Sequence, residues 1–97
     1  MEIIGTIKIK GELFESASGF QKKDMVVLTD EQYPQPLNIE FLGDKNDLPD
    51  VYQEGDKVKV SINLKGREWT SPQGEVKYFN QIVGWRIEKM QKRILNT

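Results

Sequence analysis

The segment KVKVSINLKGREW, residues 57–69, shows the most regular pattern in the chain. Apolar side chains take every second position from Val58 to Leu64, and polar side chains lie between them. Successive side chains of a β-strand point to opposite faces, so a period of two is typical of a strand with one buried face. The segment therefore predicts a long, half-buried strand.

Turn residues divide the rest of the chain at strand-like spacing. Ser71-Pro72-Gln73-Gly74 predicts a β-turn, with proline at the second position and glycine at the fourth. Four further strands are predicted over residues 3–15, 20–29, 37–41 and 78–88, the first with a bend or bulge at Gly11.

The segment DKNDLPDVYQEGD is the one candidate for a helix. Asp47 can cap it and Pro49 suits its first turn, while Leu48, Val51 and Tyr52 can face inward.

Five strands with a short helix between the third and fourth follow the element order of the OB-fold, an all-β, five-stranded Greek-key barrel. A five-stranded open sheet and an SH3-like barrel use the same elements, and the helix position favours the OB-fold. At 97 residues the chain has room for one core. We expect one domain over residues 1–97, with its core at about 2–89 and a tail at 90–97 that frays or forms a short helix.

Composition argues against catalysis. The chain has no cysteine and no histidine, so it lacks a thiol nucleophile and the most frequent general base and transition-metal ligand. Asp44, Asp47 and Asp50 lie close in sequence but match no metal-binding loop. We therefore predict no enzymatic activity, no bound metal and no small-molecule cofactor.

The longest purely aliphatic run, residues 25–28, is far shorter than a membrane span or the core of a signal peptide. This predicts a cytoplasmic protein with no membrane partner.

The net charge of −1 hides an uneven distribution. Residues 1–56 hold five lysines or arginines against twelve acids, whereas residues 57–97 hold nine against three. If the fold gathers the second half on one face, that face is a basic patch despite the low pI, and if the halves interleave the patch dissolves.

Cations and aromatic residues frame the two loops between which an OB-fold holds its ligand. Lys65, Arg67 and Trp69 share one face of the predicted fourth strand if alternation persists, and a bulge at Gly66 would turn Trp69 to the other side. The alternative for Trp69 is packing across the hairpin on Tyr78 or Phe79. The predicted nucleic-acid-binding residues are Lys22, Lys23, Lys57, Lys59, Lys65, Arg67, Trp69, Lys77 and Tyr78.

Two other aromatic side chains are expected to be buried. Trp85 shares its parity with Val83 and Ile87, and Phe20 shares its parity with Val26 and Leu28.

The runs QYPQPLNIEFLGDK, EGDKVKV, LKGREW and YFNQIVGWRIE, in this order, resemble a family of short bacterial proteins of unknown function. This DUF3127-like family occurs chiefly in Bacteroides-type bacteria and their phages, and the resemblance covers about residues 2–89. It implies an OB-fold similar to that of single-stranded DNA-binding proteins, and it implies no established activity.

Together these features predict a non-enzymatic OB-fold module that binds single-stranded nucleic acid, DNA rather than RNA, with little sequence preference. Homo-oligomerisation would raise its valency. The alternative is a protein-interaction or assembly module that uses the aromatic hairpin and the edge of the strand holding Leu37, Ile39 and Phe41.

Overall fold

Within residues 1–90, which the computed structural model describes, five strands close into a barrel in the order β1-β2-β3-β5-β4. The strands are β1 (Glu2–Glu15), β2 (Gln21–Thr29), β3 (Pro36–Leu42), β4 (Lys57–Thr70) and β5 (Val76–Lys89). Neighbours pair antiparallel except β3 and β5, which meet in parallel at Glu40 and Val83. The predicted OB-fold and its five strands are confirmed, and the predicted tail at 90–97 lies outside the described residues apart from Met90.

The first strand closes the barrel because it is long and bent. Its first residues pair with β4 from Glu2 to Thr6, and the strand pairs with β2 from Gly5 onward. Its register with β2 shifts twice, and the second shift falls between Lys10 and Leu13, around Gly11. A side chain at Gly11 would place its Cβ 2.7 Å from the backbone oxygen of Asp24. The bulge expected at Gly11 is therefore present.

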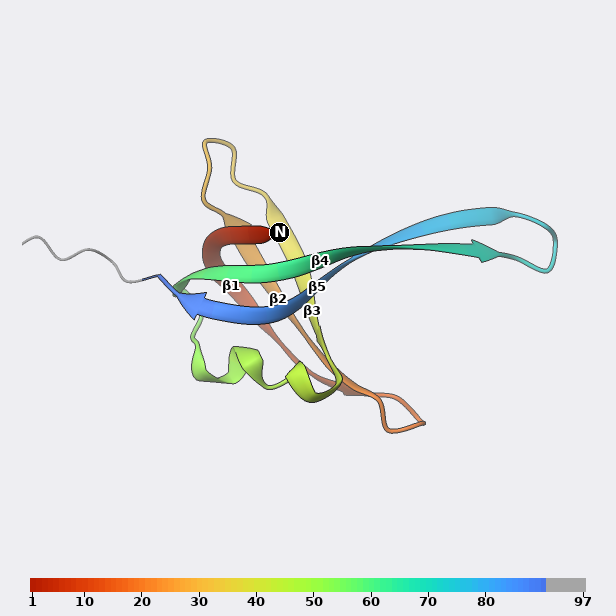
Figure 1. Ribbon diagram of the computed structural model, residues 1–97, viewed down its shortest axis with the longest axis horizontal. Helices are drawn as coiled ribbons and strands as arrows, with labels where there is room; N and C mark the ends of the chain where they lie inside the picture. The colour runs from red at the N-terminus through yellow and green to blue at the C-terminus, as the bar shows by residue number, and fades with distance from the viewer. Residues whose placement is uncertain (91–97) are drawn as a thin grey trace, which may run out of the picture.

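Two short 3-10 helices, η1 (Gly43–Lys45) and η2 (Leu48–Val51), connect β3 to β4 below the barrel (Figure 1). Pro49 is buried in the first turn of η2, while Asp47 precedes it without a capping hydrogen bond from its side chain. The hydroxyl of Tyr52 donates to the backbone oxygen of Ile87 at 3.0 Å. Val51, expected to face inward, is 80% exposed.

The core is one cluster of buried aliphatic and methionine side chains together with the Phe41 ring. Alternation in β3 and β4 accounts for most of it, as the sequence predicts, and Leu48 and Tyr52 pack against it from the connecting segment. The buried cluster consists of Ile7, Met25, Val27, Ile39, Phe41, Val58, Val60, Ile62 and Ile87.

The expectations for Phe20 and Trp85 were wrong. The inward face of β2 carries Met25 and Val27, so Phe20 belongs to the outer parity and is 46% exposed. In β5 a β-bulge interrupts alternation, because Ser61 pairs with Arg86 while Ile62 pairs with Gly84. Trp85 is the extra residue between them and is 44% exposed.

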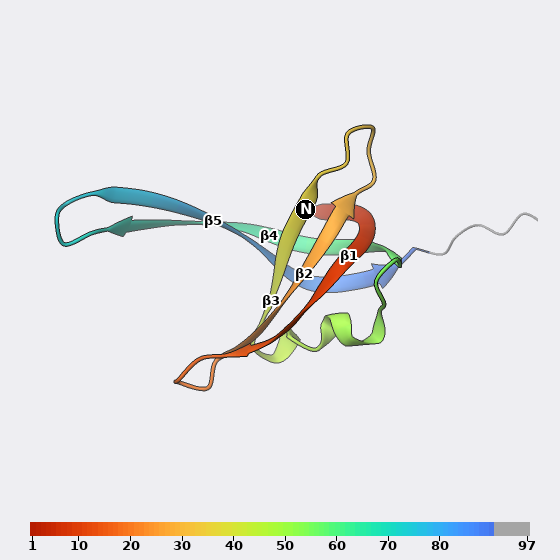
Figure 2. The ribbon, with the colours of Figure 1, turned by 180° about the vertical axis from the view of Figure 1, so that it is seen from behind.

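Beyond the barrel, β4 and β5 continue as a two-stranded hairpin (Figures 1 and 2). The hairpin makes the molecule elongated, with extents of 64, 32 and 19 Å along its principal axes. The β1–β2 and β2–β3 loops project from the two ends of the barrel wall (Figure 2).

Substitution of Gly84 tests the close packing of β5 on the core. A Cβ at this position would overlap the Phe41 ring, lying 2.7 Å from its Cζ and closer still to its Cε1. Because Phe41 is fully buried, Gly84→Ala is expected to lower the free energy of unfolding by about 1–3 kcal/mol through overpacking. Urea or thermal unfolding measures this loss.

Gly66→Ala is the matched control in the same β-ribbon. Nothing lies within 4 Å of a Cβ at Gly66, and its φ is not positive. Alanine there is expected to leave stability unchanged or raise it by about 0.5–1 kcal/mol. Equal losses at both glycines would contradict the close packing of β5 on Phe41.

Candidate nucleic-acid interface

The hairpin ends in a tight turn whose hydrogen bonds set the register of both strands. The Ser71 N–H donates to the Glu75 oxygen at 2.7 Å, and the Gly74 N–H donates to the Ser71 oxygen at 2.9 Å. Gly74 adopts φ +87°, a conformation that favours glycine. The turn predicted at Ser71–Gly74 is confirmed.

From Thr70–Val76 at the tip to Ile62–Gly84 at the barrel, the pairing of β4 and β5 runs without a register shift. Gly66 pairs with Asn80 inside this ladder, so it does not bulge and alternation in β4 persists. Residues directly opposite one another in an antiparallel pair share a face. The register therefore sorts the hairpin side chains into two faces.

One face, here called the cationic face, carries three cross-strand pairs. They are Lys65–Gln81, Arg67–Phe79 and Trp69–Lys77. The other face, here called the back face, carries the pairs Leu64–Ile82, Gly66–Asn80, Glu68–Tyr78 and Thr70–Val76.

The cationic face alternates rings and charges along both strands. Arg67 lies opposite Phe79, and the next pair toward the tip reverses the order, with Trp69 opposite Lys77. The rings are 42% exposed for Trp69 and 50% exposed for Phe79. Trp69 and Phe79 are diagonal neighbours in the ladder, and the Cα atoms of such neighbours typically stand roughly 7–8 Å apart. Two exposed rings at this spacing can each accept a base.

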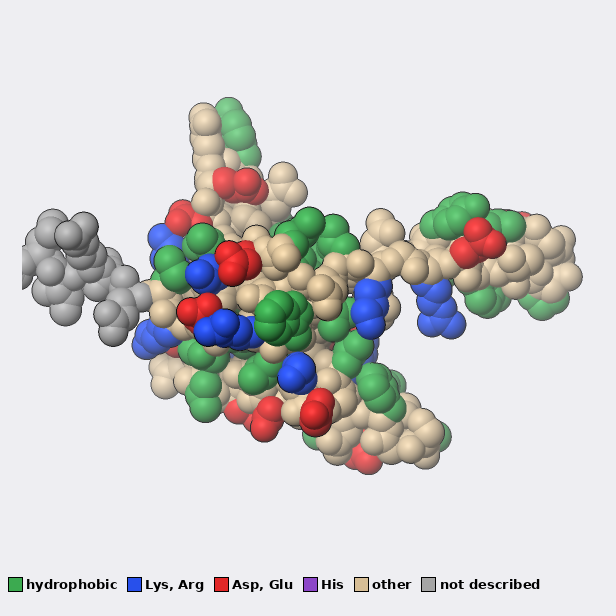
Figure 3. Space-filling model, in the orientation of Figure 1, with side chains coloured by type: hydrophobic (Ala, Val, Ile, Leu, Met, Phe, Trp, Pro, Cys, Tyr) green, Lys and Arg blue, Asp and Glu red, His purple; other side chains and the backbone are tan. Residues whose placement is uncertain are grey.

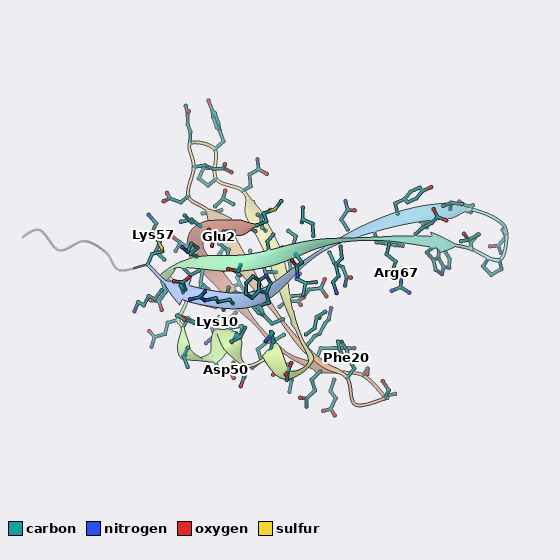
Figure 4. The ribbon with its side chains drawn as sticks, viewed as in Figure 1. Glu2, Lys10, Phe20, Asp50, Lys57 and Arg67 are labelled. Carbon is teal, nitrogen blue, oxygen red and sulfur yellow. The ribbon has the colours of Figure 1, made fainter. Side chains whose placement is uncertain are left out.

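A groove of about 550 Å³ follows this face. It is lined by Arg67, Trp69, Lys77, Phe79, Asn80 and Gln81. In Figure 4, Arg67 extends from the lower side of the hairpin, the side on which the loop with Phe20 lies.

The charges of the cationic face have no neutralising partner among the described residues. No carboxylate of residues 1–90 lies within ion-pair distance of Lys65, Arg67 or Lys77. The one acid in the paired part of the hairpin, Glu68, belongs to the back face. Figure 3 shows blue side chains without red neighbours along the lower side of the hairpin where it leaves the barrel.

The predicted lysines of the barrel are in a different electrostatic setting, because each is paired with acids. Lys23 contacts Asp50 at 2.6 Å and Lys57 contacts Asp30 at 2.6 Å. Lys59 lies 3.9 Å from both Glu2 and Glu88, and Lys22 lies 3.0 Å from Glu40. On the barrel in Figure 3, blue and red side chains accordingly lie side by side.

A small network joins the barrel to the root of the hairpin. Glu40 of β3 accepts hydrogen bonds from Lys22 Nζ at 3.0 Å and from Gln81 Nε2 at 3.3 Å. Through Gln81, the outer face of β2 and β3 is continuous with the cationic face. The hydrogen bond to Glu40 raises the pKa of Lys22, partly opposed by burial and supported by the charges of Asp24 and Glu40.

The nine predicted residues therefore occupy separate regions. Lys65, Arg67, Trp69 and Lys77 share the cationic face, whereas Tyr78 lies on the back face. Lys57 begins β4, far from Arg67 at the other end of that strand (Figure 4). Lys22 and Lys23 lie on β2. Lys59 lies in the barrel part of β4, where it pairs with Ile4 of β1 and Glu88 of β5.

Sequence reasoning missed Phe79 and Gln81 as members of this face. Counting outward from the turn would have found them, since Thr70–Val76 as the closing pair places Phe79 opposite Arg67 and Gln81 opposite Lys65. Alternation within β4 alone does not reveal the partner strand.

No three carboxylates gather within residues 1–90 as a metal ion would require, and none of the helices there is long and apolar enough to cross a membrane.

The chain belongs to the family described as a domain of unknown function, DUF3127, whose model matches residues 2–88. No curated protein matches it in sequence. Among solved structures, the wild-type single-stranded DNA binding protein from Thermus aquaticus is similar, with a TM-score of 0.68 and 19% identity. The match covers 95% of this chain and 50% of that protein, so the chain spans about half the length of its structural relative. At this identity the likeness shows the shared OB-fold.

The Lys22–Glu40 contact leads us to predict that part of the protein's stability depends on pH. A lysine whose pKa is raised in the folded state contributes stability that is fully present below the unfolded pKa, about 10.4, and is lost as pH rises through the folded pKa. We expect Glu40→Gln to lower the pKa of Lys22 toward its ordinary value. An NMR titration of the Lys22 side chain measures this shift.

Asp24→Asn is the graded control for that titration. Asp24 lies 3.9 Å from Lys22 Nζ and acts only through its charge, so its removal should shift the pKa of Lys22 less than removal of Glu40 does. A larger shift in Asp24→Asn would contradict the hydrogen bond as the main cause.

Proposed function

We propose that this OB-fold domain binds single-stranded nucleic acid on the cationic face of its hairpin, with little sequence preference. The observation that carries the proposal is the joint exposure of Trp69 and Phe79 on one face with three cations and no acid. Single-strand binding surfaces combine these two elements, a positive groove for the backbone and rings on which bases stack.

The division of labour follows from the side chains. Trp69 and Phe79 offer flat apolar rings, and every base has a face that can stack on them. Lys65, Arg67 and Lys77 flank the rings and contact phosphates, and each contact releases condensed counterions. Neither kind of contact depends on base identity, so the site favours binding without sequence readout.

DNA is proposed as the ligand in preference to RNA. The support is the fold shared with a protein described as a single-stranded DNA binding protein. The proposed activity is binding without catalysis, and the chain offers no thiol or imidazole for nucleophilic or acid–base chemistry. A comparison of oligo-dT with oligo-rU of equal length tests the preference.

A second function, assembly with another protein or another copy of the chain, is favoured by the back face. Leu64 is 60% exposed, Tyr78 73% and Val76 46%, all on one side of a two-stranded ribbon. In β3, Ile39 and Phe41 are buried, one edge of the strand is paired with β2 along its whole length, and the other edge meets β5 at Glu40 and Val83. Sedimentation of the protein alone at rising concentration tests the assembly function.

The stacking rings give the first binding test. Trp69→Ala and Phe79→Ala are each expected to weaken binding to oligo-dT by about 1–3 kcal/mol, because each removes one stacking surface. Fluorescence anisotropy of labelled oligo-dT at low salt measures the affinity.

Tyr78→Ala is the matched control, since it removes an exposed ring from the same hairpin but from the back face. Its affinity should equal that of the wild type. Loss of affinity in Tyr78→Ala with none in Trp69→Ala would move the ligand to the back face, and no binding by the wild type at tens of micromolar would refute the proposed function.

The three cations give the second binding test. Lys65→Gln, Arg67→Gln and Lys77→Gln are each expected to reduce the slope of log affinity against log salt concentration by about 0.7, the value for one phosphate contact on a single strand. Titrations at several salt concentrations give this slope. Lys45→Gln removes an exposed charge from η1, away from the hairpin, and should leave the slope unchanged.

A further inference from the structure

The outer face of β2 and β3, where OB-folds usually carry their ligand, is acidic in this protein. Its charged side chains are Lys22, Asp24 and Glu40, which sum to −1. Asp24 and Glu40 pair directly across the two strands, so two carboxylates stand side by side in the middle of this face. Like charges in such a pair repel each other and repel phosphate.

The single cation on this face is already engaged. Lys22 Nζ lies 3.0 Å from Glu40 and 3.9 Å from Asp24, so a phosphate near it competes with one carboxylate and is repelled by both. The neighbouring Lys23 is directed away, because it shares the inward parity of Met25 and Val27 and contacts Asp50 of η2. The barrel thus presents no uncommitted positive charge along the usual path.

The acidic pair also lies where the cationic face ends. Gln81, opposite Lys65 at the root of the hairpin, lines the groove and donates to Glu40, so this carboxylate lies next to one end of the groove. A nucleic-acid strand that leaves the groove toward the barrel therefore meets the negative charge of Glu40 immediately after it passes Lys65.

We infer that the nucleic-acid footprint is confined to the cationic face, and that Asp24 and Glu40 exclude the strand from the barrel. This inference rests on the proposed function and restricts the ligand to a short single-stranded segment. Two rings accept two neighbouring bases, and three cations match the three phosphates that flank two nucleosides. Four residue steps, from Lys65 to Trp69, span roughly 14 Å, which fits such a segment.

The length dependence of binding tests this inference in the unaltered protein. Oligo-dT of 2, 3, 4, 6, 8 and 12 nucleotides, each phosphorylated at the 5′ end, is titrated at constant salt. The affinity, divided by the number of registers each oligomer offers, should stop rising at three or four nucleotides. The salt slope should level off near −2, three contacts at about 0.7 each.

A charge-neutralising variant tests the role of the acids. The double variant Asp24→Asn, Glu40→Gln keeps both shapes, removes two negative charges and frees Lys22. It should extend the footprint beyond four nucleotides and steepen the salt slope by about 0.7. Lys22→Gln in the otherwise unaltered protein should leave affinity and slope unchanged, and it serves as the second arm if the double variant does not fold.

The outcomes separate the inference from the function on which it rests. Binding that strengthens per register up to 8 or 12 nucleotides, or a slope that falls in Lys22→Gln, overturns the confined footprint while single-strand binding stands. A wild-type protein that binds no oligomer at any length overturns the proposed function itself.

Discussion

The contact between Gly84 and the Phe41 ring determines the shape of this protein. At this point β5 crosses the barrel closely enough to meet β3 at Glu40 and Val83, and a side chain larger than hydrogen would keep the strands apart. The bulge at Trp85 follows immediately and adds one unpaired residue to β5. Because of this extra residue, the inward-facing positions are odd-numbered after the bulge and even-numbered before it. Barrel closure and the orientation of the hairpin thus depend on the same short segment.

The bulge has a direct consequence for the candidate site. Counted from Ile87 without a bulge, Phe79 would share the inward face of β5. With Trp85 as the extra residue, Gly84 and Ile82 take the inward parity, and Phe79 and Gln81 turn outward toward the surface that holds Glu40. An isolated two-stranded ribbon is marginal in water, and we propose that the exposed rings on this one serve a binding partner.

The strands, the turn and most of the core were predictable from sequence because they follow local rules. Alternation in β4 has a period of two, and Ser71–Gly74 carries the residue types of a tight turn. The errors arose where tertiary contacts override these rules. Phe20 follows the parity of Val26, yet the packed barrel selects the other face of β2, and nothing in the run around Trp85 marks which residue is extra.

Of the candidate site, the part that follows local alternation was predictable from the sequence, and the part that depends on cross-strand register was not. Alternation placed Lys65, Arg67 and Trp69 together, and cross-strand register was needed to add Phe79 and to separate Tyr78. The ion pairs of the barrel lysines could not be predicted from the sequence, because the fold alone brings Lys57 to Asp30 and Lys23 to Asp50. A run of lysines in sequence does not reveal which of them remain available to a phosphate.

Net charge is therefore a poor guide to the partner of this protein. The chain carries −1 overall, but folding leaves an excess of acids on the barrel, where Lys22, Lys23 and Lys57 are paired with carboxylates, while the cationic face keeps three positive charges. Within a Debye length, about 8 Å in physiological salt, a nucleic-acid strand bound on the hairpin would experience mainly the charges nearest to it. We propose that a weakly acidic protein presents in this way a local site for a polyanion, and we infer that the acids beside that site limit how far the polyanion extends.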